Sequence, residues 1–215
     1  MKLMHFDIET CGNYENWETF KKEDPKGSSL FEKKYNKIWS DKTIEEAYLD
    51  NSPVVSTYGK ICCISMGFYS DKGERINSIY SENEQEIIQK FNQTLIKIDS
   101  KGYSLTGYRI KNFDIPWVLH KMHKYKIKPS NLINPYFKKP WEVKIVDLAE
   151  DWKQRFAWAS TFDEVCYELN IPSPKEKMDG SNVHEEYYKN HLDKIAEYCE
   201  MDIKSSIMLE RLMYL

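Results

Sequence analysis

Two carboxylates lie one residue apart near the start of the chain. Asp7 and Glu9 interrupt a mostly apolar run over residues 1–8. In a β-strand, residues i and i+2 point to the same face, so these two side chains would project together while Phe6 and Ile8 pack into the core. Neighbouring carboxylates repel each other and lose solvation unless a positive charge lies between them. A divalent cation with oxygen ligands would supply that charge. The more ordinary alternative is the solvated face of an edge strand.

A third acidic side chain lies where a strand is predicted to give way to a helix. Asp114 follows a predicted strand over Tyr103–Tyr108 and opens a predicted helix over Phe113–Tyr125. Sites of α/β sheets are built at this edge. The helix dipole also favours an aspartate in the first turn without any further role, so both interpretations of Asp114 are open at this point.

The last predicted helix, over Leu192–Leu215, carries a tyrosine and a fourth carboxylate. Tyr198 and Asp202 are four residues apart and share a helix face. That face also carries Ile195 and Leu209, so it points largely toward the body of the protein. An inward-facing aspartate needs a partner, and this stretch offers no basic residue at a matching spacing.

The chemistry of these side chains favours a particular class of cofactor. Four convergent carboxylates without histidine or cysteine suit Mg²⁺ or Mn²⁺ rather than zinc. Two such ions roughly 3.5–4 Å apart can clamp a phosphodiester, one activating water and the other stabilising the leaving oxygen. The pattern therefore predicts hydrolysis of a phosphodiester with the help of two divalent cations.

The elements that must position these groups alternate in the manner of a mixed α/β layer fold. Further strands are predicted at Lys60–Tyr69, Arg75–Tyr80 and Val143–Leu148, and further helices at Glu84–Ile98, Phe162–Leu169 and Ser181–Tyr188. The length of 215 residues and the hydrophobic content of 41% suit one domain with a real core. A single domain over residues 1–215 is the prediction.

An insertion over about residues 11–52 interrupts this plan. Short helices are expected at 30–38 and 43–49, and the segment contains too few aliphatic residues to bury a core of its own. Its lysines and aromatic rings interleave. That mixture either binds the bases and phosphates of a nucleic-acid strand or packs its rings onto the main body. We predict a contribution to strand binding.

Composition limits which partners and which cellular compartment are expected for the protein. A net charge of −3 does not mark a strongly basic nucleic-acid binder, although local lysine patches can serve that purpose. The five cysteines show no zinc spacing, which predicts reduced thiols in a cytoplasmic protein. Neither a signal peptide nor a stretch of the ~18 apolar residues of a membrane span is present, so no membrane is expected as a partner.

Three smaller features leave two interpretations each. His120 and His123 have a spacing that could bind a metal, but no third ligand is near in sequence. Lys175 and Lys177 lie in a loop bounded by proline and glycine, where a lysine either contacts a phosphate or is solvated. The basic and aromatic turn over residues 137–141 leaves the same choice.

Three stretches together carry a resemblance to a known family. Residues 6–10 (Phe-Asp-Ile-Glu-Thr), residues 112–116 (Asn-Phe-Asp-Ile-Pro) and Tyr198-x-x-x-Asp202 resemble the three exonuclease motifs of the DEDD superfamily, in their expected order. Tyrosine rather than histidine at position 198 places the chain with the DEDDy branch. It is most similar to the 3′–5′ exonuclease domain of family B DNA polymerases, especially the stand-alone predicted exonucleases related to it. The resemblance covers most of residues 1–10 and 54–215.

This resemblance implies a fold and a set of metal ligands. The family fold is RNase H-like, a mixed five-stranded sheet flanked by helices. Asp7, Glu9 and Asp202 would hold the metal that activates water, and Asp7 would also bridge to a second metal. Asp114 would act at or near that second metal, through water.

The resemblance also assigns the remaining site residues. Tyr198 would orient the attacking water through its hydroxyl, since an unperturbed phenol has a pKa near ~10 and is a poor base. Thr10, Asn112 and Phe113 occupy motif positions where the family contacts the terminal nucleotide.

The expected function is that of a 3′–5′ exonuclease acting in DNA repair or proofreading. Two Mg²⁺ or Mn²⁺ ions would assist the release of nucleoside 5′-monophosphates from single-stranded DNA 3′ ends. An exoribonuclease with the same metal core, and a non-catalytic nucleic-acid-binding module that keeps the fold, are the alternatives. Since no polymerase segment follows Leu215, proofreading would require a separate polymerase or repair protein, unless the chain is an excised domain.

Overall fold

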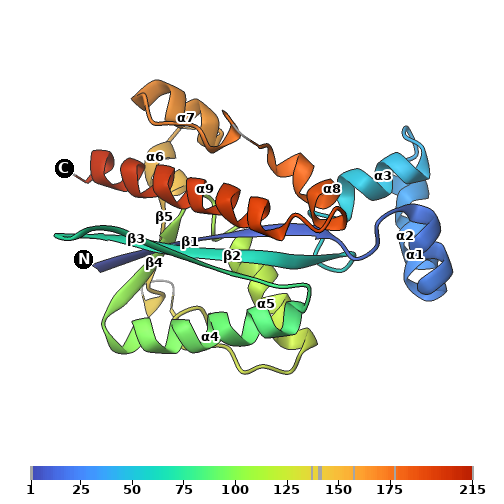
Figure 1. The fold of residues 1–215 in the computed structure, drawn as a ribbon, viewed down its shortest axis with the longest axis horizontal. Helices are drawn as coiled ribbons and strands as arrows, with labels where there is room; N and C mark the ends of the chain where they lie inside the picture. The colour runs from blue at the N-terminus through green and yellow to red at the C-terminus, as the bar shows by residue number, and fades with distance from the viewer. Residues whose placement is uncertain (1, 137, 140–141, 157, 177, 215) are drawn as a thin grey trace.

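A five-stranded mixed sheet with β1 at its centre forms the middle layer of the molecule (Figure 1). The computed structural model describes residues 2–136, 138–139, 142–156, 158–176 and 178–214. The strands lie in the order β3-β2-β1-β4-β5, with β1 antiparallel to β2 and parallel to β4. Their bounds are β1 Lys2–Gly12, β2 Gly59–Ser70, β3 Gly73–Tyr80, β4 Tyr103–Gly107 and β5 Ile145–Asp147. The predicted mixed sheet of five strands is confirmed.

Helices cover both faces of this sheet (Figure 1). One face is covered by α4 (Glu84–Ser100) and α5 (Asp114–Lys124). The other is covered by α6 (Leu148–Lys153), α7 (Phe162–Leu169), α8 (Val183–Tyr188) and α9 (Leu192–Met213), with short 3₁₀ turns at Pro174–Glu176 and Gly180–Asn182. None of the described helices is long and apolar enough to cross a membrane.

The alternation of β1 decides which side chains enter the core. Phe6 and Ile8 belong to the main hydrophobic cluster with residues of α4 such as Phe91, whose ring centre lies 5.4 Å from that of Phe6. The residues between them therefore face α9 on the opposite side of the sheet. This alternation is what the sequence predicted for Asp7 and Glu9.

The insertion forms three helices that gather around aromatic rings. They are α1 (Trp17–Glu23), α2 (Pro25–Ile38) and α3 (Ile44–Asn51). The buried members of their cluster are Trp17, Phe20, Phe31, Ala47, Tyr48 and Tyr58. The prediction that this segment cannot bury its own core is wrong, because aromatic rings bury ~150–250 Å² each and replace the missing aliphatic side chains. The buried rings are also closed to stacking with bases.

Most predicted elements are confirmed, but two helices were missed and three elements have different bounds, among them the helix expected at 30–38, which begins at Pro25. The helices α1 and α6 were not predicted; Asn16 and Asp147 cap them by accepting hydrogen bonds from their first-turn amides. The strand β5 is limited to three residues because Asp147 already begins the turn into α6. The predicted helix over residues 181–188 begins at Val183, since the residues before it form a 3₁₀ turn.

Candidate active site

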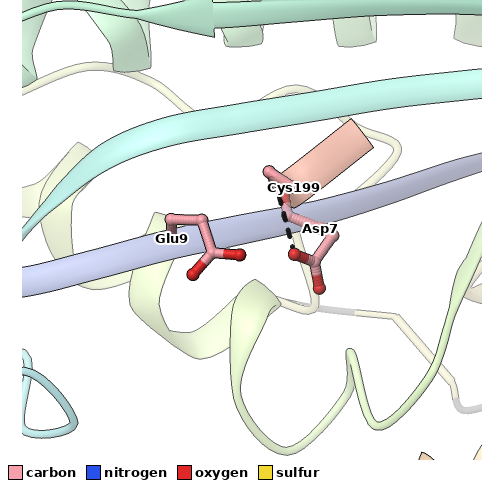
Figure 2. Close-up of side chains that lie close together, drawn as sticks. All are labelled: Asp7, Glu9 and Cys199. Carbon is pink, nitrogen blue, oxygen red and sulfur yellow. Dashed lines mark hydrogen bonds between the residues drawn. The ribbon is translucent and has the colours of Figure 1, made fainter. Parts of the chain in front are cut away.

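Asp7 and Glu9 point from β1 to the same side, as Figure 2 shows. Their carboxylate oxygens and the sulfur of Cys199 lie within 4.8 Å of one another. Glu9 is buried and Asp7 is half-buried. The two acidic groups thus lie close together in a place where water reaches them poorly, which costs free energy unless positive charge is brought to them.

Cys199 is a member of this centre that the sequence prediction left out. It lies on α9, and its thiol donates a hydrogen bond to Asp7 Oδ2 at 3.4 Å. Burial raises the pKa of the thiol well above its usual range, so the group stays protonated and acts as a donor rather than as a thiolate ligand. Cys199 thus adds a neutral donor beside the predicted carboxylates, and oxygen remains the charged ligand type. Cys199 lies three residues before Asp202 and shares its helix face, and this spacing could have predicted its place in the centre.

Asp114 reaches the centre from the first turn of α5. The parallel pairing of β1 with β4 extends only to His5 opposite Thr106. Beyond that point, the amide of Ile8 donates to Asp114 Oδ1 at 3.1 Å. The buried carboxylate of Asp114 therefore fixes α5 against β1 at a residue that lies between Asp7 and Glu9. Asp114 is thus both the aspartate of a first helical turn and a side chain bound to the central strand beside Asp7 and Glu9.

Polar contacts along α9 fix its register on β1. The buried ring of His5 lies 2.8 Å from Ser206 Oγ through Nδ1 and 3.0 Å from Glu210 Oε2 through Nε2. Together with the bond from Cys199 to Asp7, these contacts hold the helix face of Tyr198 and Asp202 toward the acidic strand. Tyr198 is buried, and its hydroxyl makes no hydrogen bond with the described part of the chain. That hydroxyl is free to bind water or substrate.

The charges of Asp114 and Asp202 act on the pair of carboxylates on β1, although neither residue joins the group of Asp7, Glu9 and Cys199 whose ligand atoms all lie within 4.8 Å of one another. Burial, followed by the charges of Asp202 and Asp114, raises the pKa of Asp7 well above its usual range. Burial and the neighbouring Asp7 and Asp202 do the same for the pKa of Glu9. Burial raises the pKa values of Asp114 and Asp202 to about 7. Such a concentration of repelling oxygen ligands fits a hard divalent cation.

Lys175 brings positive charge to the rim of this centre. Its Nζ lies 2.7 Å from Asp163 Oδ2 and 3.3 Å from Asp179 Oδ2, and its charge lowers the pKa of Asp202. The half-exposed lysine therefore joins α7 to the loop before α8. Whether it contacts a phosphate stays a prediction, and Lys177 lies outside the described residues.

The three predicted substrate-binding residues, Thr10, Asn112 and Phe113, differ in how far they are exposed. The hydroxyl of Thr10 donates to Pro53 O at 2.5 Å, which ties β1 to the insertion. Asn112 is exposed, and the half-buried ring of Phe113 packs beside Trp117 with ring centres 5.8 Å apart. Of these side chains, Asn112 is the one most open to a ligand.

The two histidines that the sequence left as possible metal ligands make other contacts. The ring of His120 contacts Ser56 Oγ at 2.8 Å, and the ring of His123 packs against Tyr136. Neither histidine belongs to the metal-ligating cluster found in the described part of the chain. Phe137 and Trp141 of the basic and aromatic turn lie outside the described residues.

The chain is similar to known proteins in both sequence and structure. A family model described as a predicted 3′–5′ exonuclease related to the exonuclease domain of PolB matches residues 54–214. The family B DNA polymerase from the hyperthermophilic archaeon Pyrobaculum calidifontis has a similar structure, with a TM-score of 0.61 and 15% sequence identity. The similarity covers 99% of this chain and 24% of the polymerase, so the chain spans about a quarter of that protein. A search of curated proteins found no match. The structural likeness confirms the expected RNase H-like fold.

Proposed function

The chain belongs to the family of predicted 3′–5′ exonucleases related to the exonuclease domain of PolB, and from this premise we propose that it is an active, metal-dependent 3′–5′ exonuclease. Its proposed substrate is single-stranded DNA, from which it releases nucleoside 5′-monophosphates. The observation that carries this proposal is the close approach of Asp7 and Glu9 on one side of β1, with ligand atoms within 4.8 Å, where burial and the charges of Asp202 and Asp114 raise the pKa of both carboxyls.

The donor set of this centre suits Mg²⁺ or Mn²⁺. Asp7, Glu9 and Asp202 would hold one ion, while Asp7 and Asp114 would hold a second. Once bound, the two ions would activate water and offset the charge of the phosphate and the leaving oxygen. The protonated thiol of Cys199 does not compete as a charged sulfur ligand, which agrees with a preference for hard cations.

The side chains of the protein orient the reacting groups. Burial, followed by the charges of Asp202 and Glu9, raises the pKa of Tyr198 far above its usual range. The phenol is therefore neutral at any physiological pH and orients water by hydrogen bonding instead of removing its proton. Cys199 holds Asp7, and the Ile8 amide holds Asp114, so the ligands are arranged before substrate arrives.

The insertion is proposed to hold the strand by charge. Its rings are largely buried, whereas Lys21, Lys22, Lys33 and Lys37 are exposed on α1 and α2. Phosphate contacts from such lysines would be independent of base sequence and would weaken as salt increases. Deleting the segment would be expected to weaken strand affinity more than it changes the chemical step. Roles in DNA repair, or in proofreading beside a separate polymerase, are consistent with this activity.

A time course with end-labelled oligonucleotides tests the proposal. Matched single-stranded and double-stranded DNA and RNA are incubated with the protein in Mg²⁺ or Mn²⁺, and in EDTA. We expect stepwise shortening of single-stranded DNA from its 3′ end that EDTA and Asp7→Ala abolish. Faster loss of RNA would assign an exoribonuclease. Tight binding without metal-dependent cleavage would assign a non-catalytic module, and full activity of Asp7→Ala would refute the site.

A further inference from the structure

Two large aromatic side chains stand out of the surface between α6 and α7. Phe156 is 74% exposed and Trp158 is 90% exposed. They line a groove of about 640 Å³ together with Lys153, Gln154 and Ser160. Aromatic rings of this size normally bury most of their area, so two of them on one exposed segment mark a contact surface.

Two cations, Lys153 and Arg155, lie along the groove and its edge, where the acidic side chains are Asp151 and Glu150. Glu150, at its edge, is paired with Lys111 at 2.6 Å, and Asp151 accepts a hydrogen bond from the hydroxyl of Tyr214. Lys153 and Arg155 make no ion pair with a described residue. Exposed rings interleaved with unmatched cations fit a polyanion that also presents flat apolar faces.

Two sets of contacts connect this surface to the carboxylate centre. On one side, Ser160 O accepts hydrogen bonds from the Tyr108 hydroxyl at 2.6 Å and from Arg109 Nη2 at 3.0 Å. Arg109 begins the turn that leads to Asp114, and its carbonyl accepts the amide of Asn112 at 3.0 Å. The groove therefore borders the turn that delivers a proposed metal ligand.

On the other side, the segment runs directly into α7. The ring of Phe162 stacks on Tyr108 with ring centres 4.9 Å apart. The next residue, Asp163, holds Lys175 beside Asp202. The exposed rings thus lie close to two elements that border the carboxylate centre, the turn before Asp114 and α7. A DNA strand whose 3′ end lies in that centre could extend over them.

We propose that Phe156 and Trp158, flanked by Lys153 and Arg155, form a stacking platform for the bases of single-stranded DNA that precede the 3′-terminal nucleotide. This inference rests on the proposed exonuclease function and adds to it a basis for selecting single strands. Bases in a duplex are stacked on one another and cannot lie on the rings, whereas every unpaired base offers a face to them.

Binding without cleavage tests the platform separately from the nuclease activity. Fluorescence anisotropy of labelled dT20 and dT4 is measured in EDTA for the wild type and for the double variant Phe156→Ala/Trp158→Ala. We expect the Kd for dT20 to rise at least tenfold, while the Kd for dT4, which occupies the centre alone, changes less than threefold. Tyr167→Ala removes an equally exposed ring, 83% exposed, that does not line the groove, and should leave both values unchanged.

Two further variants separate stacking from charge. Trp158→Phe keeps a ring and should stay within threefold of the wild type. Lys153→Ala/Arg155→Ala should reduce the slope of log Kd against log salt by about 1. Both aromatic positions are exposed, so thermal unfolding should not change.

An unchanged Kd for dT20 in the double variant would overturn the platform. The same holds if the Kd rises no more than it does in Tyr167→Ala, or if the wild type does not bind dT20. A wild type that binds dT20 through these rings but does not shorten it would refute the proposed nuclease and leave the platform standing.

Discussion

The thiol of Cys199 donates a hydrogen bond to the carboxylate of Asp7, with Sγ 3.4 Å from Oδ2. The two residues are 192 positions apart in the chain and come from the last helix and the first strand. The same sulfur lies 3.6 Å from the backbone carbonyl oxygen of Asp7. This side chain thus orients a proposed metal ligand and, together with His5, holds the register of α9 on β1.

Cys199→Ala should lower activity without abolishing it. Asp7 loses a donor that holds its carboxylate, and the loss of one orienting hydrogen bond in such a site costs about tenfold or more in kcat. Cys199→Ser keeps a hydroxyl donor and should recover most of the activity. Measuring kcat and KM on labelled single-stranded DNA compares the two. Equal loss in both variants would show that the sulfur acts through packing alone.

Asp202→Asn should abolish activity and stabilise the metal-free protein. Folding raises the pKa of this carboxyl from 3.8 to about 7, so the folded state holds more protons between these values and stability falls as pH rises through that window. At pH 8 the amide removes a repelled charge, and we expect the free energy of unfolding to increase by about 1–2 kcal/mol. The gain should vanish near pH 4.

Urea unfolding in EDTA at pH 8 and pH 4 measures this stability difference. Asp71→Asn, which changes an exposed acid in the turn between β2 and β3, is the control and should show no gain. A less stable Asp202→Asn protein at pH 8 would contradict the electrostatic account of the centre.

Tyr198→Phe should reduce kcat while leaving metal binding intact. Its hydroxyl has no hydrogen-bond partner in the described chain, so removing it costs little stability. Loss of a group that orients water should lower kcat by about 10²-fold with little change in KM. Mn²⁺ should still raise the thermal midpoint of the variant, as it does for the wild type. A lost metal response would indicate that the phenol supports the ligands.

Lys175→Ala should weaken catalysis more than stability. The lysine and its partners Asp163 and Asp179 are each about a third to a half exposed, so these salt bridges contribute less than about 1 kcal/mol. Its charge also lowers the pKa of Asp202, and removing it should shift the acidic limb of the pH–rate profile upward. Lys175→Arg should restore the profile. An unchanged profile in Lys175→Ala would leave the lysine a purely structural role.

Acid should loosen the insertion through His184. The ring accepts a hydrogen bond from the amide of Gly12 at Nδ1 over 3.0 Å and donates from Nε2 to the carbonyl of Glu15 over 2.8 Å, so it is neutral in the folded protein. Burial lowers its pKa below 6.5. The contribution of this contact to stability is complete above pH 6.5 and is lost as pH falls toward the folded-state value.

Hydrogen exchange of the Gly12 amide, corrected for intrinsic rates, checks this prediction. Its protection should fall between pH 7 and pH 5, whereas the amide of Gly67 within β2 should not respond. His184→Gln should show the same protection at both pH values. A wild-type amide that exchanges equally at both would remove His184 from the attachment of the insertion.

The local geometry of the site could be predicted from sequence because it depends on short repeats. The two-residue period of a strand places Asp7 and Glu9 on one side of β1, and the helical period places Tyr198 and Asp202 on one side of α9. Each of these predictions needs only neighbours within a few residues.

What the tertiary structure alone decided is which faces meet and which side chains remain outside. The Ile8 amide bonds Asp114 across 106 positions, and Cys199 enters the centre because α9 packs at one register fixed by His5. The rings of the insertion are buried among themselves, while Phe156 and Trp158, of the same residue types, stay exposed. Burial depends on the surface that a neighbouring element presents, and no periodicity within one segment contains that information.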